Sequence, residues 1–247
     1  MQKGEVTASP NDSPFMTPET ETPPTVSVDA GAFGAWLVEF RESLRGYGGT
    51  HVPCGECVGC CVSSYSILVR PEDTQALAAI PAQLLTRVSS FGAGVKAMGY
   101  LPDGRCPMLR AGQCSIYSHR PQTCRDYDCR VFAAAGIDAG DTKPAINQRV
   151  REWRFTYASE QDRAAHRAVR AAATFILEHH AEFPEQRLPK NPSGIAVLAV
   201  KCHEVFLEDT LTGRSAADVA SAIANASRRF DESAQSRSRP VPKPGAT

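Results

Sequence analysis

The sequence lacks the features that mark several common classes of protein. Its longest uninterrupted apolar run covers only residues 195–200, which is far too short to cross a bilayer. It has no glycine-rich phosphate loop, no nucleophile elbow and no His-x-x-x-His metal motif. Acidic and basic residues balance to a formal net charge of +0, so no overall field attracts nucleic acid or an anionic membrane. Neither of these partners is implied.

The cellular compartment affects what a dense set of cysteines does. The first residues, MQKGEVTASPNDSPF, contain no apolar stretch like the core of a signal peptide. We therefore expect a soluble, cytoplasmic protein whose thiols stay reduced. Clustered cysteines in such a compartment more often hold a metal or carry out redox chemistry than form a disulfide framework, which would require export.

The length of 247 residues fits one globular domain with flexible tails. Residues 1–28 are rich in Thr, Glu, Ser and Pro, and residues 231–247 end in SRSRPVPKPGAT, so both ends are predicted to be disordered tails. Between them we expect a single globular unit over residues 29–230, with a cysteine-cluster region at 50–132 and a helical region at 150–230. The predicted fold class is α+β, mainly helical, with a short strand and an irregular, metal-organised centre.

Hydrophobic periodicity predicts the elements around the cysteines. Helical spacing runs from Phe33 to Leu44, alternation over residues 65–69 indicates a strand, and a helix is expected after Pro71. A second helical stretch is predicted over residues 82–91. Farther on, Ser159 and Asp162 resemble a capping box. Two later apolar faces predict further helices, with the residues Ile195, Leu198, Cys202 and Val205 on one and Val219, Ile223, Ala226 and Phe230 on the other.

The strongest functional signal is a C-x2-C-x2-C-C run formed by Cys54, Cys57, Cys60 and Cys61. Spacers of two residues let neighbouring thiolates converge on one centre from a tight turn, as in zinc knuckles and iron–sulfur loops. Cys60 and Cys61 are adjacent, and consecutive side chains of an extended backbone point in opposite directions. One of the two is therefore expected to face a second centre.

A second, less regular group consists of Cys106, Cys114, Cys124 and Cys129, separated by seven, nine and four residues. It completes a set of eight thiols, which is enough for two four-thiolate sites or for one cluster with spare redox thiols. The pattern does not decide which cysteines share a site. Three early cysteines followed by a remote Cys-Pro are similar to a ferredoxin-like ligand pattern, which favours iron, although the three-residue spacer usual before that cysteine is absent here.

Arginines interleave this second group, and nearby cations favour thiolate over thiol. They would partly balance the negative charge of a multi-thiolate site, unless they are solvated or paired with the neighbouring aspartates. The arginines are Arg105, Arg110, Arg120, Arg125 and Arg130.

The run CGECVGCC, followed by GRCPMLRAGQCSIYSHRPQTCRDYDCR, resembles the YkgJ-type cysteine-cluster family, a zinc- or iron-chelating domain with a CxxCxxCC pattern. The resemblance covers roughly residues 50 to 132 and falls on all eight clustered cysteines. It implies metal chelation and does not imply a reaction. The accompanying positions of the resemblance are Ile116, Tyr117, Arg120, Pro121, Arg125 and Tyr127.

Other candidate ligands receive a simpler interpretation. Cys202 lies on the apolar stripe of a predicted helix, where a free cysteine is commonly buried as a small hydrophobic residue. His51 and His119 could each replace a thiolate as a metal ligand. With eight thiols present, we expect these histidines to lie at the surface or to contact the ligands without binding the metal. Tyr117 and Tyr127 are expected to cover the site and limit access of water.

Three functions are compatible with this pattern. The first is a metal-binding module in which zinc or iron organises the cysteine-rich centre. The second is an iron–sulfur protein that transfers electrons, or that serves as an enzyme or accessory protein acting on a macromolecule. The third is a thiol redox sensor based on the adjacent Cys60 and Cys61. The predicted partner is a metal ion or cluster, and the pattern names no protein partner.

Overall fold

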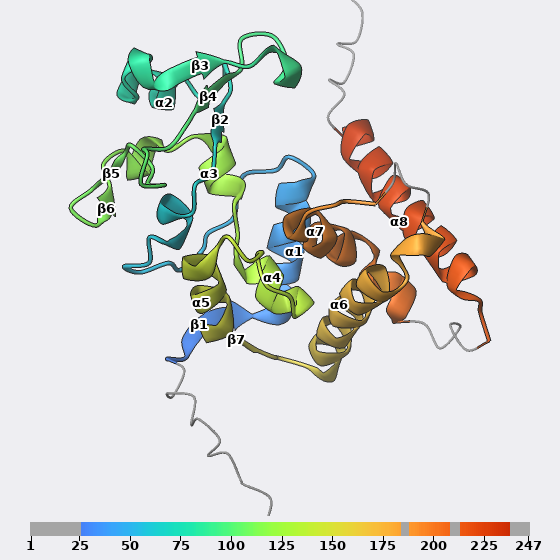
Figure 1. Cartoon of the computed structure of the whole chain (residues 1–247). Helices are drawn as coiled ribbons and strands as arrows, with labels where there is room; N and C mark the ends of the chain where they lie inside the picture. The colour runs from blue at the N-terminus through green and yellow to red at the C-terminus, as the bar shows by residue number, and fades with distance from the viewer. Residues whose placement is uncertain (1–25, 184–187, 208–212, 238–247) are drawn as a thin grey trace, which may run out of the picture.

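The computed structural model describes residues 26–183, 188–207 and 213–237. Its buried apolar side chains form two separate clusters. The larger cluster lies among the helices of residues 26–50 and of the chain from residue 127 onward, which we call the helical lobe. The smaller lies among the short strands of residues 66–126, the small lobe. Residues 51–65 run between the two and are called the cysteine loop (Figure 1).

The helical lobe is built from α-helices whose apolar faces meet in the larger cluster. The predicted first helix is confirmed as α1, which buries Phe33 and Trp36. The predicted capping box is confirmed at the start of α6, where the Asp162 N–H donates to Ser159 Oγ at 3.1 Å. None of the helices in the described ranges is long and apolar enough to cross a membrane. The elements are α1 (Phe33–Leu44), α4 (Arg130–Ala135), α5 (Pro144–Glu152), α6 (Glu160–Glu178), α7 (Pro192–Cys202) and α8 (Ala216–Arg237), with the 3₁₀ turns η5 (His180–Glu182) and η6 (His203–Phe206).

A parallel strand pair ties the start of the described chain to the segment after the cysteines. Strand β1 (Val28–Ala32) pairs with β7 (Trp153–Thr156), with Val28 opposite Trp153. The sequence pattern predicted neither strand, since each is short and the pairing joins segments far apart in the chain. The pair fixes the buried Trp153 at the edge of the cysteine region.

The small lobe is an antiparallel sheet with the strand order β2-β4-β3. The predicted strand at residues 65–69 is confirmed as β2, and a helix follows Pro71 as expected. Val69 and Met98 are buried between the sheet and α2. The elements are η1 (Gly59–Val62) in the preceding cysteine loop, then β2 (Ile67–Val69), α2 (Thr74–Ala79), η2 (Ala82–Leu84), β3 (Leu85–Arg87), η3 (Ser89–Phe91), β4 (Lys96–Met98), β5 (Leu109–Arg110), β6 (Gln113–Cys114), η4 (Tyr117–His119) and α3 (Gln122–Asp126).

Two predicted element boundaries are corrected. The helix expected over residues 82–91 is wrong, because β3 pairs there with β4, and cross-strand pairing outweighs a weak helical pattern. Helix α8 continues to Arg237, seven residues past the predicted boundary at residue 230. An ion pair of 2.6 Å between Lys201 Nζ and Asp231 Oδ1 holds this part of α8 against α7. Residues 1–25 and 238–247 of the predicted tails lie outside the described residues.

The cysteine loop packs closely against the helical lobe. A Cβ atom on Gly59 would lie 3.2 Å from the Ala145 carbonyl oxygen of α5, so this close approach favours glycine. Lys143 donates a hydrogen bond from Nζ to the Ser63 carbonyl, and its ammonium lies 4.2 Å from the centre of the Tyr65 ring. These contacts hold the loop where it can face both lobes.

Candidate metal centre

Backbone hydrogen bonds curl the first cysteine group into tight turns. The Cys57 N–H donates to the Cys54 carbonyl at 3.0 Å, and the Cys61 N–H donates to the Val58 carbonyl at 2.8 Å. Cys60 and Cys61 lie in the 3₁₀ turn η1, so the extended backbone assumed from the sequence is wrong. With about three residues per turn, adjacent side chains of a 3₁₀ helix still leave the backbone in different directions.

The second group reaches the same place from several elements. The Cys106 N–H donates to the Cys61 carbonyl at 2.7 Å and so joins the two groups directly. The β5–β6 hairpin brings Cys114 back beside residues 106–109. Cys124 is carried by α3, and Cys129 caps the start of α4. Short elements that carry little hydrophobic signal therefore position these four thiols.

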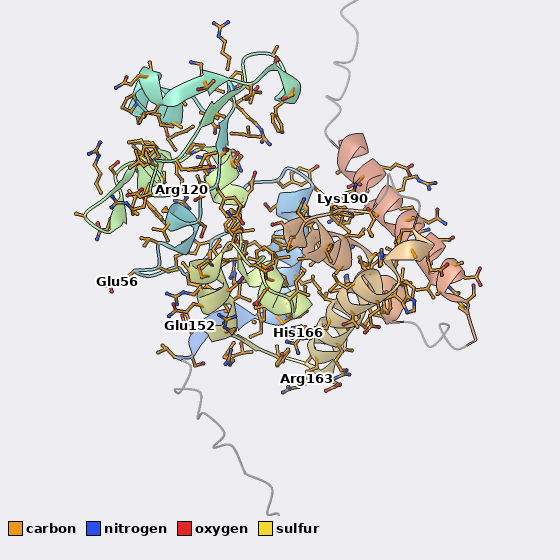
Figure 2. All side chains as sticks on the ribbon, viewed as in Figure 1. Glu56, Arg120, Glu152, Arg163, His166 and Lys190 are labelled. Atoms are coloured by element: carbon orange, nitrogen blue, oxygen red, sulfur yellow. The ribbon has the colours of Figure 1, made fainter. Side chains whose placement is uncertain are left out.

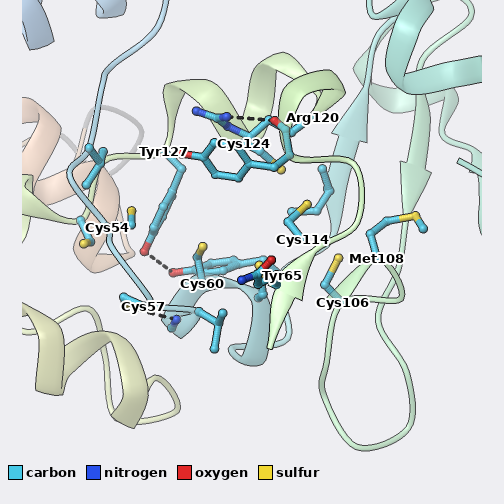
Figure 3. Close-up of a pocket in the computed structure, with 18 of the residues that line it drawn as sticks. Cys54, Cys57, Cys60, Tyr65, Cys106, Met108, Cys114, Arg120, Cys124 and Tyr127 are labelled. Carbon is cyan, nitrogen blue, oxygen red and sulfur yellow. Dashed lines mark hydrogen bonds between the residues drawn. The ribbon is translucent and has the colours of Figure 1, made fainter. Parts of the chain in front are cut away.

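A cavity of about 860 Å³ opens where these elements meet between the two lobes. Figure 3 shows thiols of both groups around it. The tertiary structure thus brings the two sequence groups to one place. The cavity is lined by all eight clustered cysteines: Cys54, Cys57, Cys60, Cys61, Cys106, Cys114, Cys124 and Cys129.

Burial raises the pKa of several of these thiols. It raises the pKa of Cys54 to about 11, and the pKa of Cys124 and of Cys129 to about 12 each, because a thiolate loses its hydration there. The pKa of Cys60 moves in the opposite direction. The Cys61 thiol donates a hydrogen bond to Cys60, which lowers the pKa of Cys60 to about 7 and raises that of Cys61. Without a cation, the buried members of the set stay protonated near neutral pH.

Three polar side chains other than the cysteines lie beside the thiols. Trp153 Nε1 donates to Cys129 Sγ at 3.2 Å. The Arg149 guanidinium of α5 hydrogen-bonds to Cys57, and Arg120 lines the cavity from the small lobe (Figures 2 and 3). Such donors stabilise negative charge on sulfur. Sequence reasoning missed Arg149 and Trp153, because no spacing rule connects α5 and β7 to the cysteines.

The arginines that interleave the second group have different surroundings. Arg120 lies at the cavity, as the charge argument expected. Arg130 is instead buried against Asp128, with 2.7 Å between Nη2 and Oδ2. Arg105 forms an exposed pair with Asp103, also at 2.7 Å. The alternative of pairing with neighbouring aspartates therefore describes Arg105 and Arg130.

The remaining candidate ligands lie away from the cavity. His51 is exposed, and its backbone N–H donates to Glu39 at 2.8 Å. His119 is exposed and contacts Gln75, with 3.3 Å between Nδ1 and Oε1. Cys202 is fully buried in the helical lobe, which confirms its interpretation as a small hydrophobic residue.

Tyrosines cover the cavity, as predicted for Tyr117 and Tyr127. Tyr117 is 54% exposed and lies under the guanidinium of Arg120, 4.1 Å from ring centre to Cζ. Tyr127 is more enclosed, and burial raises the pKa of its hydroxyl. Its hydroxyl oxygen lies 3.4 Å from that of Tyr65, a partner that sequence reasoning had assigned only to a strand.

The donor chemistry of the cavity fits zinc or iron. Eight thiols, of the ligand type that both metals accept, line one cavity, with an N–H donor beside them. Within the described residues, no three His, Cys, Asp or Glu side chains are already gathered around one point as a metal ion would hold them. Binding would therefore require the thiols to lose protons and move inward, which couples metal binding to local folding.

Comparison with known proteins agrees with this chemistry. Residues 53–156 match the family model CxxCxxCC, described as "Putative zinc- or iron-chelating domain". This part of the chain is similar to that family. The match extends beyond residue 132, where the sequence resemblance ended, and so includes Arg149 and Trp153. No curated protein and no solved structure matches the chain. Helices α6 to α8 lie outside the matched residues.

Proposed function

We propose that this protein binds zinc or iron through its eight clustered cysteines, in a centre that joins the two lobes. The supporting observation is the cavity itself, which is lined by all eight thiols. These thiols come from the cysteine loop, the small lobe and the start of α4. A metal bound to such a set stabilises contacts among three parts of the chain at once.

The small lobe has little apolar core of its own to stabilise it. Its apolar cluster is centred on short segments around Val69, Ile80 and Met98 and is much smaller than that of the helical lobe. A small core leaves little stabilisation after the loss of chain entropy. A structural zinc ion contributes about 10–16 kcal/mol of apparent binding free energy, which is enough to order such a region.

Metal content measured after anaerobic purification tests the proposal. We expect zinc or iron in the wild-type protein and less metal in Cys57→Ser, whereas Cys202→Ala serves as a matched control that keeps the wild-type content. Removal of the metal with a chelator is expected to make residues 51–129 sensitive to protease. A wild-type protein that carries neither metal, and takes up neither on reconstitution, would overturn the proposal.

An iron–sulfur centre is the second candidate. The cavity of about 860 Å³ has room for a cluster as well as for a single ion, and thiolates are the ligands that such clusters use. Cluster ligation by these thiols would suit electron transfer, or a role as an enzyme or accessory protein that acts on a macromolecule.

The two candidates differ in a visible property. An iron–sulfur centre gives a brown protein with visible absorption, which Cys57→Ala or Cys60→Ala should reduce. A colourless anaerobic preparation with stoichiometric zinc would exclude the iron–sulfur candidate and leave the zinc centre.

A further inference from the structure

A second hollow lies in the helical lobe, apart from the cysteine cavity, with which it shares no lining residue. Its volume is about 480 Å³, and it is bordered by α4, α5, β7 and α6, which lie together in Figure 1. Phe132, Val150 and Trp153 are buried core residues that line it, so close-packed elements hold its shape. Hollows of this size accept small molecules.

Positive charge dominates this hollow, which we call the arginine pocket. It is lined by Arg151, Arg154 and Arg170, against Asp138 as the acidic member of the described lining. Arg151 pairs with Asp138 at 3.4 Å, but more than half of each side chain is exposed, so water screens the pair. The other two arginines therefore have no negative partner in the lining.

Arg170 differs from the other arginines of α6 in having no carboxylate partner. Arg163 and Arg167 both pair with Glu160, at 3.8 and 2.8 Å. Arg170 forms no ion pair with any residue that the structure describes. Its guanidinium lies against Gly136, where an added Cβ atom would come within 3.1 Å of Nε. The exposed side chain thus places an unbalanced charge beside the end of α4.

Arg154 is held in place by the backbone around it. Its Nη1 donates to the carbonyl of Arg151 at 2.6 Å and to that of Trp153 at 2.9 Å. These bonds use one nitrogen and orient the guanidinium, while its Nε and Nη2 donors stay available to a ligand. An oriented guanidinium binds the oxygens of a phosphate or carboxylate in pairs, which makes such a position suited to an oxyanion.

We propose that the arginine pocket binds a phosphate group, free or as the ester of a small molecule, through Arg154 and Arg170. Their two positive charges match the charge of about −1.5 to −2 that a phosphate group carries at pH 7, whereas a carboxylate carries one. Nucleic acid is the less suitable ligand, because the chain has a formal net charge of +0 and this charge lines a pocket instead of a long stripe. The site is independent of the proposed metal centre.

Isothermal titration calorimetry of the full chain as purified, with inorganic phosphate as the probe, tests the proposal. We expect a Kd below about 1 mM, and a loss of about tenfold or more in affinity for Arg154→Gln and for Arg170→Gln. Arg167→Gln is the matched control, since Arg167 is exposed on the same helix but pairs with Glu160, and it should keep the wild-type affinity. Asp138→Asn removes the opposing charge and should tighten binding about threefold.

Two further probes identify the source of the phosphate group. Binding of glycerol 3-phosphate that is tighter than that of inorganic phosphate would show an ester, and weaker binding would show the free ion; either result supports the site. A DNA duplex that displaces phosphate and binds more tightly than both would overturn the assignment to a small molecule.

Several results would overturn the pocket. They are the absence of phosphate binding by the wild type, equally tight binding of acetate at matched ionic strength, and phosphate affinity that is unchanged in both Arg154→Gln and Arg170→Gln, as for phosphate held at a metal. If these two variants fail to fold by circular dichroism, Asp138→Asn decides, and binding that is no tighter than in the wild type would refute the proposal. Metal content, measured on the same samples, reports separately on the proposed function.

Discussion

Replacing Arg130 with methionine tests what holds the helical lobe together beside the cysteines. The Asp128 carboxylate has no exposed side-chain surface and accepts hydrogen bonds from Arg130, the shortest at 2.7 Å, and from Trp36 Nε1 at 3.0 Å. Arg130 also donates to the carbonyls of Ala30 and His51, at 3.1 Å each. One guanidinium therefore connects β1, the cysteine loop and α4.

The magnitude follows from the burial of this pair. Methionine fills a similar volume but leaves the Asp128 carboxylate buried without a countercharge. Removing one partner of a buried ion pair costs about 3–5 kcal/mol. With a urea dependence of about 2 kcal/mol per molar, the unfolding midpoint should fall by about 2 M.

Urea unfolding of the protein as purified, followed by far-UV circular dichroism, measures this change at the same metal content for each variant. Arg105→Met is the matched control, because its pair with Asp103 has the same 2.7 Å distance but is about half exposed. Its cost should stay below about 1 kcal/mol. Equal costs for Arg105→Met and Arg130→Met would refute the reasoning.

Three further predictions concern other contacts. Burial lowers the pKa of His166 to about 4, whereas the pKa of an unfolded histidine is 6.5. Between these two pH values the unfolded chain binds a proton at His166 that the folded protein does not bind. The folded state therefore loses stability as pH falls from about 6.5 to about 4. Allowing for partial exposure of the ring, the free energy of unfolding should fall by about 1 kcal/mol from pH 7 to pH 5. In His166→Phe, the urea midpoint of unfolding should change less over the same pH range. Trp153→Phe, which removes the donor to Cys129, should weaken metal affinity about tenfold in a chelator competition, and unchanged affinity would contradict the role. Ser159→Ala should cost about 1 kcal/mol in thermal unfolding through the lost bond from Asp162, while Ser159→Thr should retain most of the stability.

The sequence by itself determined the features that depend on neighbouring residues. The helical spacing of apolar residues such as Phe33 and Trp36 predicted α1, and the N-cap residue Ser159 predicted the start of α6. Both patterns depend only on residues within one or two turns of the helix. The type of ligand was equally local. A C-x2-C-x2-C-C run identified soft sulfur donors in a tight turn, and the family match agrees with that chemistry.

Only the tertiary structure decided how distant segments meet. Residues 82–91 contain β3 because β4 offers a partner, and a helical pattern cannot reveal that pairing. Arg149 and Trp153 reach the thiols because α5 and β7 pack beside the cysteine loop and β1. Long-range contacts depend on the packing of whole elements, and for that reason the sequence named the candidate ligands but not how they are arranged around the cavity.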